Sequence, residues 1–126
     1  MKGKVLFAVS ALALLTSTVS AGGSWKPVSK GVSRGNLATT SLWGDAPSPS
    51  AMRLIVNAVP NQRVDVSWRV SCVTADFDYA SRSRDFEAMT PVERDLPVTM
   101  QNAEYCSTYV SASNNEGKIV TKVQYR

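Results

Sequence analysis

The sequence predicts an all-β fold, a small antiparallel sandwich of two sheets. Apolar and polar residues alternate with a period of two in several segments, and no segment after the first 21 residues carries a helical period. Residues that favour turns separate these segments at intervals of roughly 8 to 12 residues, which is typical of sandwiches. With 126 residues and 44% hydrophobic content, the chain is long enough for one compact domain but too short for two ordinary cores.

The first 21 residues are expected to be an export signal. Lys2 and Lys4 precede an apolar run at 5–15, and Val19-Ser20-Ala21 offers the small residues that a signal peptidase prefers. The run is shorter than the about 20 residues needed to span a bilayer, and a buried helix would leave both lysines unexplained. We therefore expect residues 1–21 to be removed and the product to be secreted or extracytoplasmic, without membrane insertion. Removing two of the 14 basic residues, against 10 acidic ones, leaves a net charge of +2.

Residues 22–50 are predicted to form a loop-rich N-terminal segment. Glycine and proline recur throughout it, and each proline lacks the N–H that a strand ladder needs. Only residues 36–43 have the pattern of a strand, and residues 45–50 are expected to link strands. The sandwich domain is accordingly predicted at residues 51–126.

Two strands joined by a turn are predicted between residues 52 and 73. Residues 52–59 alternate, residues 60–62 read Pro-Asn-Gln as a turn, and residues 63–73 alternate most clearly. The apolar face of the second strand consists of Val64, Val66, Trp68, Val70 and Cys72. At the helical period the same segment would spread charge around the whole circumference, so a strand is favoured. We expect the two strands to form a hairpin with Trp68 in the core.

The rest of the chain is predicted to supply two short edge strands and a second hairpin. Residues 84–90 and 96–100 are expected to be the short strands, because proline limits both. Residues 105–113 and 118–125 alternate again, and Asn114-Asn115-Glu116-Gly117 between them favours a turn because Asn and Gly tolerate positive φ. We expect these last two strands to pair.

Cys72 and Cys106 are expected to form a disulfide. Thiols outside the cytoplasm usually oxidise, and the chain has an even number of them. The bridge would close a loop of 35 residues, which is worth about 3 to 4 kcal/mol in the chain-entropy model. A reactive thiol is disfavoured, because the chain has no histidine to activate it and the second cysteine would be left over.

Three segments resemble small secreted immunoglobulin-like proteins of actinobacteria, a group without an assigned activity: VDVSWRVSC at 64–72, TPVERDLP at 90–97, and Cys106 followed by VSA at 110–112. The resemblance covers residues 52–126 and carries no site residues across. It implies an immunoglobulin-like sandwich in which the disulfide joins the two sheets. Trp68, four residues before Cys72 on the same face, would then lie beside the bridge.

No catalytic residue, cofactor or metal site is predicted. The absence of histidine excludes His-based triads, bases and metal ligands, and two cysteines are too few for a multi-thiolate zinc or iron–sulfur site. Calcium is the alternative to consider at Asp76, Asp78, Asp85 and Glu87. Their spacing is not that of an EF-hand and arginines lie among them, so a solvated hairpin is favoured.

A candidate partner-binding face is predicted on the last hairpin. Its outward positions include Tyr105 and Tyr109, with serines between them, and Lys118 and Lys122 on the next strand. Tyrosine supplies rigid contact area, serine supplies adaptable hydrogen bonds, and the lysines favour an acidic partner. The alternative is that the tyrosines only contact their cross-strand neighbours.

The sequence therefore indicates a secreted, non-catalytic binding or cell-envelope interaction module, with a protein or a cell-envelope polymer as its partner. Nucleic acid is not expected, because a net charge of +2 without a block of Lys and Arg does not favour it. The alternative is a small exported enzyme, or an enzyme inhibitor that acts through a loop at residues 76–84.

Overall fold

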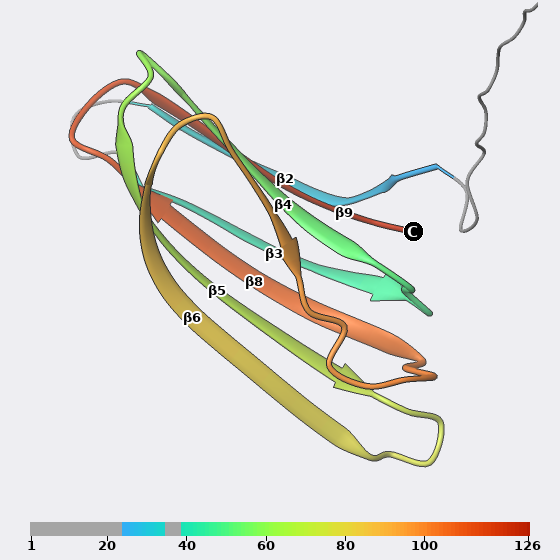
Figure 1. The fold of residues 1–126 in the computed structure, drawn as a ribbon. Coiled ribbons are helices and arrows are strands. Elements are labelled where there is room, and N and C mark those ends of the chain that lie inside the picture. Colours follow the sequence, from blue (N-terminus) through green and yellow to red (C-terminus); the bar gives the residue numbers. More distant parts are fainter. Residues whose placement is uncertain (1–23, 35–38) are drawn as a thin grey trace, which may run out of the picture.

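Two antiparallel sheets of four strands each face one another in the structure, a computed structural model that describes residues 24–34 and 39–126 (Figure 1). Every strand pair is antiparallel. These described ranges contain no helix. The predicted all-β, two-sheet sandwich is confirmed, while the expected export signal at residues 1–21 lies outside the described residues.

The strands are β2 (Lys26–Arg34), β3 (Thr39–Pro47), β4 (Met52–Val59), β5 (Arg63–Val73), β6 (Tyr79–Met89), β7 (Val92–Leu96), β8 (Tyr105–Ser113) and β9 (Lys118–Tyr125). The first sheet has the order β2-β9-β4-β7 and the second has the order β3-β8-β5-β6. Only the connection from β5 to β6 joins neighbours in one sheet, and every other connection between these strands crosses to the opposite sheet. Two sheets of four strands linked in this way form a jelly roll.

The immunoglobulin-like arrangement predicted from the sequence is wrong in its strand order. An immunoglobulin domain groups its strands as ABED and CFG, so that several consecutive strands pair as hairpins. Here β4 and β5 lie in different sheets, and so do β8 and β9. Neither of the two predicted hairpins exists, because alternation marks the inward face of a strand without saying to which sheet the strand belongs. Among the strands that the structure describes, the one hairpin between consecutive strands is β5–β6, in which Val73 pairs with Tyr79.

The N-terminal segment contributes more structure than its glycines and prolines predict. β2 pairs with β9 at the edge of the first sheet, and β3 pairs with β8 at the edge of the second. The sandwich therefore includes strands from residues 26–47 and is not confined to residues 51–126. Edge strands accept such residues more readily than central strands, because one side of their backbone is free of ladder bonds.

The core lies between the sheets and consists of the inward faces of the central strands. On β4 and β5 the buried residues alternate as predicted, and Trp68 is only 8% exposed. β6 and β7 differ from the predicted short strands at 84–90 and 96–100, since β6 starts at Tyr79 and β7 ends at Leu96. Phe86 and Ala88 of β6 pack partly against the core, as expected.

The disulfide joins Cys72 and Cys106 as predicted, but within one sheet. The two residues are register partners on the neighbouring strands β5 and β8. Their Cα atoms are 4.0 Å apart, which fits adjacent strands, whereas facing sheets pack about 10 Å apart. The expectation of a bridge between sheets is wrong because both cysteines face the core from the same sheet.

Candidate functional site

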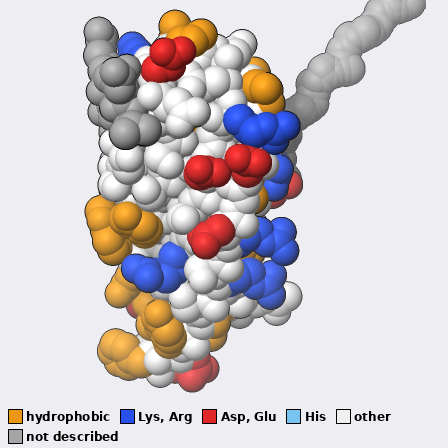
Figure 2. Space-filling model, turned by 90° about the vertical axis from the view of Figure 1, so that its left-hand side faces the viewer, with side chains coloured by type: hydrophobic (Ala, Val, Ile, Leu, Met, Phe, Trp, Pro, Cys, Tyr) orange, Lys and Arg blue, Asp and Glu red, His pale blue; other side chains and the backbone are white. Residues whose placement is uncertain are grey.

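The outward face of the second sheet gathers aromatic and polar side chains in three rows. The first row holds Trp43, Tyr109, Arg69 and Ser83; the second Asp45, Ser107, Ser71 and Ser81; the third Pro47, Tyr105, Val73 and Tyr79. Residues two apart on a strand are about 7 Å apart and neighbouring strands about 4.8 Å apart, so the three rows cover about 14 Å in each direction. Figure 2 shows hydrophobic side chains gathered on the lower part of this face, with basic side chains beside them.

Trp43 and Tyr109 form the centre of the first row. Their ring centroids are 4.6 Å apart with the planes tilted by 52°, a favourable aromatic pairing. Trp43 is 62% exposed, although burial of an indole is strongly favourable. Arg69 lies on the other side of Tyr109, with its guanidinium carbon 5.8 Å from the ring centroid. An indole left in water beside a tyrosine and an arginine is typical of a binding surface.

The second row carries hydrogen-bonding groups beside these rings. The Ser107 hydroxyl donates to Asp45 at 2.8 Å, and the Ser71 and Ser81 hydroxyls are 3.0 Å apart. The Tyr79 hydroxyl donates to Ser71 Oγ at 3.3 Å. Ser71, and after it Ser81, stabilise the phenolate, so that the pKa of Tyr79 is lowered from its usual value.

The third row adds two more exposed rings at the end of the sheet. Tyr105 and Tyr79 lie on either side of Val73 in the register. We call Trp43, Tyr79, Tyr105 and Tyr109 the aromatic face. An open hollow of about 270 Å³ lies within it, lined by Trp43, Arg69, Ser71, Tyr79, Ser107, Thr108 and Tyr109. The arrangement presents ring surfaces together with donors and acceptors, and it suits a ligand that has both apolar and hydroxyl groups.

The structure brings together two of the four residues predicted to bind a partner. Tyr105 and Tyr109 lie on the aromatic face, on β8 of the second sheet. Lys118 and Lys122 alternate with buried residues on β9, so they lie on the outward side of the first sheet. The expected single surface of tyrosines and lysines is therefore wrong, because β8 and β9 are not neighbours in one sheet.

The sequence reasoning missed Trp43, Arg69 and Tyr79 as members of this surface. Trp43 ends the strand predicted at 36–43, and Arg69 lies on the side of residues 63–73 opposite the predicted apolar face. Their meeting with Tyr109 follows from β8 lying between β3 and β5. A tryptophan on the polar side of an alternating strand is the sequence signal that could have pointed to Trp43.

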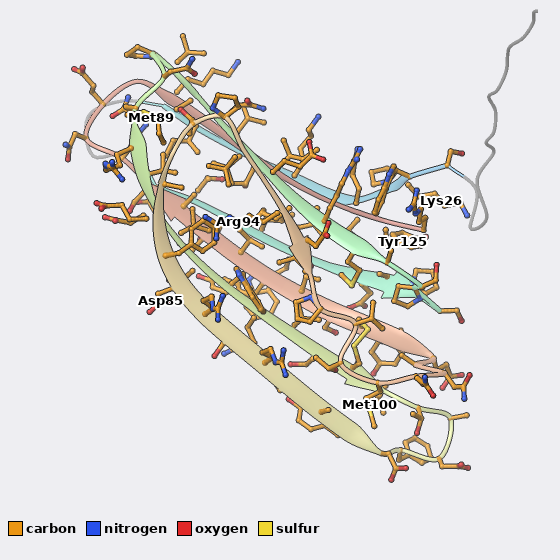
Figure 3. All side chains as sticks on the ribbon, in the orientation of Figure 1. Lys26, Asp85, Met89, Arg94, Met100 and Tyr125 are labelled. Carbon is orange, nitrogen blue, oxygen red and sulfur yellow. A yellow bond between two sulfur atoms is a disulfide. The ribbon has the colours of Figure 1, made fainter. Side chains whose placement is uncertain are left out.

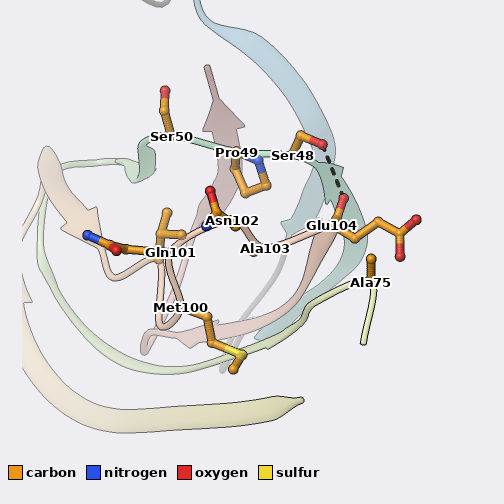
Figure 4. A pocket seen from close by; sticks show the side chains of 10 residues that line it. Ser48, Pro49, Ser50, Ala75, Met100, Gln101, Asn102, Ala103 and Glu104 are labelled. Atoms are coloured by element: carbon orange, nitrogen blue, oxygen red, sulfur yellow. Dashed lines mark hydrogen bonds between the residues drawn. The ribbon is translucent and has the colours of Figure 1, made fainter. Parts of the chain in front are cut away.

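A larger hollow lies beside the end of the aromatic face (Figure 4). Its volume is about 920 Å³, and it is lined by residues 48–50, Ala75 and residues of the segment 98–104. The Ser48 amide donates to the Glu104 carbonyl at 2.8 Å across it. Glu104 is the one ionisable side chain among the lining residues, so the hollow offers no pair of acid and base groups.

The acidic residues considered for calcium do not form a site. Asp76 and Asp78 lie in the β5–β6 turn, whereas Asp85 and Glu87 lie on the outward side of β6. No group of three or more potential metal ligands occurs in the part of the chain that the structure describes. The predicted loop at 76–84 is also shorter than expected, because the strand begins at Tyr79. Phe77 occupies its tip and is 87% exposed.

The fold is similar to that of solved carbohydrate-binding proteins. TmCBM61, solved in complex with beta-1,4-galactotriose, matches with a TM-score of 0.50 and 11% identity over 81% of this chain and 87% of its own. A structure from work on the promiscuous specificity of carbohydrate-binding modules of the β-sandwich superfamily matches with a TM-score of 0.41 and 11% identity, over 82% of this chain and 53% of its own. At these identities the likeness concerns the fold alone.

The sequence matches no model of a known protein family and no curated protein significantly. The resemblance to secreted actinobacterial proteins therefore stays a prediction. No helix in the described ranges is long and apolar enough to cross a membrane.

Proposed function

We propose that the protein is an exported, non-catalytic carbohydrate-binding module that holds its ligand on the aromatic face. The observation that carries the proposal is the exposed Trp43 paired with Tyr109 and flanked by Arg69. Around this row stand Asp45 and a set of serine hydroxyls. Stacking surface and hydrogen-bonding groups are thus combined on one rigid sheet.

The chemistry of a sugar ring matches this combination. A pyranose has an apolar face of C–H groups and a rim of hydroxyls. The C–H face can lie on the indole of Trp43, where it removes apolar surface from water. The hydroxyl rim can donate to the Asp45 carboxylate and accept from the Arg69 guanidinium. Because the groups sit on paired strands, little conformational freedom is lost when the ligand binds.

Two further observations support export and the binding of a sugar. The Cys72–Cys106 disulfide fits an oxidising compartment, in agreement with the signal predicted at residues 1–21. The fold similarity to TmCBM61 supports a sugar as the ligand, since that protein was solved with beta-1,4-galactotriose. The partner is accordingly a carbohydrate polymer, such as one of the cell envelope.

Binding to beta-1,4-galactotriose and to a panel of neutral polysaccharides, measured by calorimetry and affinity electrophoresis, tests the proposal. Trp43→Ala should weaken binding by more than about tenfold, because truncating an aromatic hot spot costs about 2 kcal/mol or more. The pair Tyr105→Ser and Tyr109→Ser should also weaken it. Met89→Ser is the matched control, since Met89 is an exposed apolar residue at the opposite end of β6, and it should leave affinity unchanged.

Two results would contradict the proposal. One is the absence of binding to every carbohydrate in the panel. The other is binding that survives Trp43→Ala and the double tyrosine change. The enzyme-inhibitor alternative depends on the tip of the β5–β6 turn, where Phe77 is exposed. If Phe77→Ser abolishes ligand binding while Trp43→Ala leaves it intact, that alternative is favoured.

A further inference from the structure

A cleft opens along the edge of the sandwich where β6 and β7 stand apart. β6 is the edge strand of the second sheet and β7 the edge strand of the first. After the turn that joins them, the two strands diverge (Figure 1). The cleft has a volume of about 560 Å³ and is lined by Trp68, Arg82, Ser83, Arg84, Asp95, Leu96 and Pro97. This size is within the range of small-ligand sites.

The side of β6 that faces this cleft carries arginines where the other strands carry core residues. Arg84 is the register partner of Trp68 and Arg82 is the partner of Val70, so both arginines share the inward side of the sheet. On β3, β5 and β8 the corresponding inward positions hold no charged residue. Arg82 and Arg84 are nevertheless exposed, because β7 does not cover them and burial of unpaired charge would be costly.

The facing strand adds a third arginine at an inward position. Arg94 of β7 pairs in register with Leu54, a fully buried core residue. Its guanidinium carbon lies 4.1 Å from the ring centroid of Phe86 on β6. Arg94 thus reaches across the open edge (Figure 3). Arg94 therefore lies between the two edge strands against Phe86, although it is not one of the residues that line the cleft.

These arginines lack carboxylate partners in the part of the chain that the structure describes. The two ion pairs found there are Arg53–Glu93 and Arg63–Glu87. Asp95 is the one acidic residue that lines the cleft. Its register partner is Arg53, which places it on the outward side of the first sheet. With Arg82 and Arg84 against Asp95, the lining of the cleft carries a net positive charge.

We propose that this cleft is a second site, which binds an anionic sugar by its carboxylate or sulfate group. A guanidinium offers a planar fork of donors that matches such oxygens in pairs. Arg82 and Arg84 are two residues apart, and their Cα atoms are thus about 7 Å apart, so they can engage one anionic group or two neighbouring ones. Pro97 and the small exposed edges of Leu96 and Trp68, which are 4% and 8% exposed, offer a limited apolar contact for the ring. That the anion belongs to a sugar rests on the proposed function.

Calorimetry at about 0.15 M salt, where charges more than about 8 Å from a ligand are largely screened, tests this site with trigalacturonate, a sulfated galactose oligosaccharide and neutral beta-1,4-galactotriose. The double change Arg82→Gln and Arg84→Gln should lower the affinity for an anionic sugar by about tenfold or more, as expected for lost charge-assisted hydrogen bonds. Affinity for galactotriose should not change. Comparing the affinities of the two anionic sugars tells whether the carboxylate or the sulfate is preferred. A lower affinity for either anionic sugar in the double variant supports the site.

The matched control is the double change Lys118→Gln and Lys122→Gln, which removes the same charge from the first sheet. It should keep the affinity for anionic sugars within about twofold, because both lysines lie on the outward side of the other sheet and charges far from a ligand are screened at this salt concentration. Equal losses in both double variants would show a net-charge effect and overturn the proposal.

Unchanged binding in the arginine variant, or no binding of either anionic sugar to the unmodified protein, would also overturn the proposal. If binding is unchanged and the variant self-associates, the role of Arg82 and Arg84 is to keep the exposed edge strand β6 from pairing with another chain. Trp43→Ala reports on the aromatic face independently, so failure of that proposal is distinguishable from failure of this one.

Discussion

Two tryptophans of the second sheet have opposite surroundings. Trp68 faces the core and is 8% exposed, while Trp43 faces outward and is 62% exposed. The hydrophobic effect alone would bury both rings. Trp68 can be explained by core stability, whereas an exposed Trp43 on a rigid strand is better explained by a ligand.

Unfolding by urea should separate these two roles. Trp68→Ala should lower the free energy of unfolding by about 3 to 5 kcal/mol, because it loses buried area and leaves a cavity. Trp43→Ala should lower it by less than about 1 kcal/mol, because most of the ring is already in water. Similar losses for the two variants would mean that the exposed ring is structural, and the ligand explanation for Trp43 would fail.

At the scale of elements, the disulfide fixes the alignment of two strands beneath the aromatic face. Cys72 pairs with Cys106 between the rows Ser71–Ser107 and Val73–Tyr105. The bridge lies on the core side of β5 and β8, and the neighbouring rows point outward. The position of Tyr105 relative to β5 is therefore set by a covalent bond as well as by the ladder.

Replacement of both cysteines by serine should cost stability while avoiding an unpaired thiol. With a sequence separation of 34 between the two cysteines, we expect a loss of about 2 to 5 kcal/mol in the free energy of unfolding. The measurement is the urea midpoint of the Cys72→Ser, Cys106→Ser variant against the oxidised protein. An unchanged midpoint would show that the ladder between β5 and β8 needs no covalent support.

Alternation in the sequence predicts individual strands well and their partners poorly. The bounds 52–59, 63–73, 105–113 and 118–125 agree with the structure, because each strand buries one face and exposes the other. The strand predicted at 84–90 is shorter than β6, since the residues 79–83 that begin β6 are mostly polar and Arg82 stands at an inward position. A strand shows the same alternation whichever of the two sheets it joins, so the pattern does not tell which strands pair. The predictions of both hairpins and of a disulfide between the sheets are therefore wrong.

At the scale of the whole molecule, the jelly roll places different chemistry on different surfaces. The aromatic face occupies one broad side, the lysines of β9 lie on the opposite side, and the arginines line the open edge. From the sequence, two of the four rings of the aromatic face could be found, namely Tyr105 and Tyr109. Trp43, Arg69 and Tyr79 join them only through the strand order, which the residue pattern does not encode.

The central claim is that a carbohydrate lies on the aromatic face. Its most direct test is an NMR titration of the ¹⁵N-labelled protein with the tightest neutral oligosaccharide, or with beta-1,4-galactotriose if none is tighter. We predict the largest shifts for the Trp43 indole N–H and for backbone amides of the three rows, notably near Arg69, Tyr79 and Tyr109. Shifts confined to the β9 side around Lys118 and Lys122, or the absence of shifts at saturating ligand, would contradict the claim.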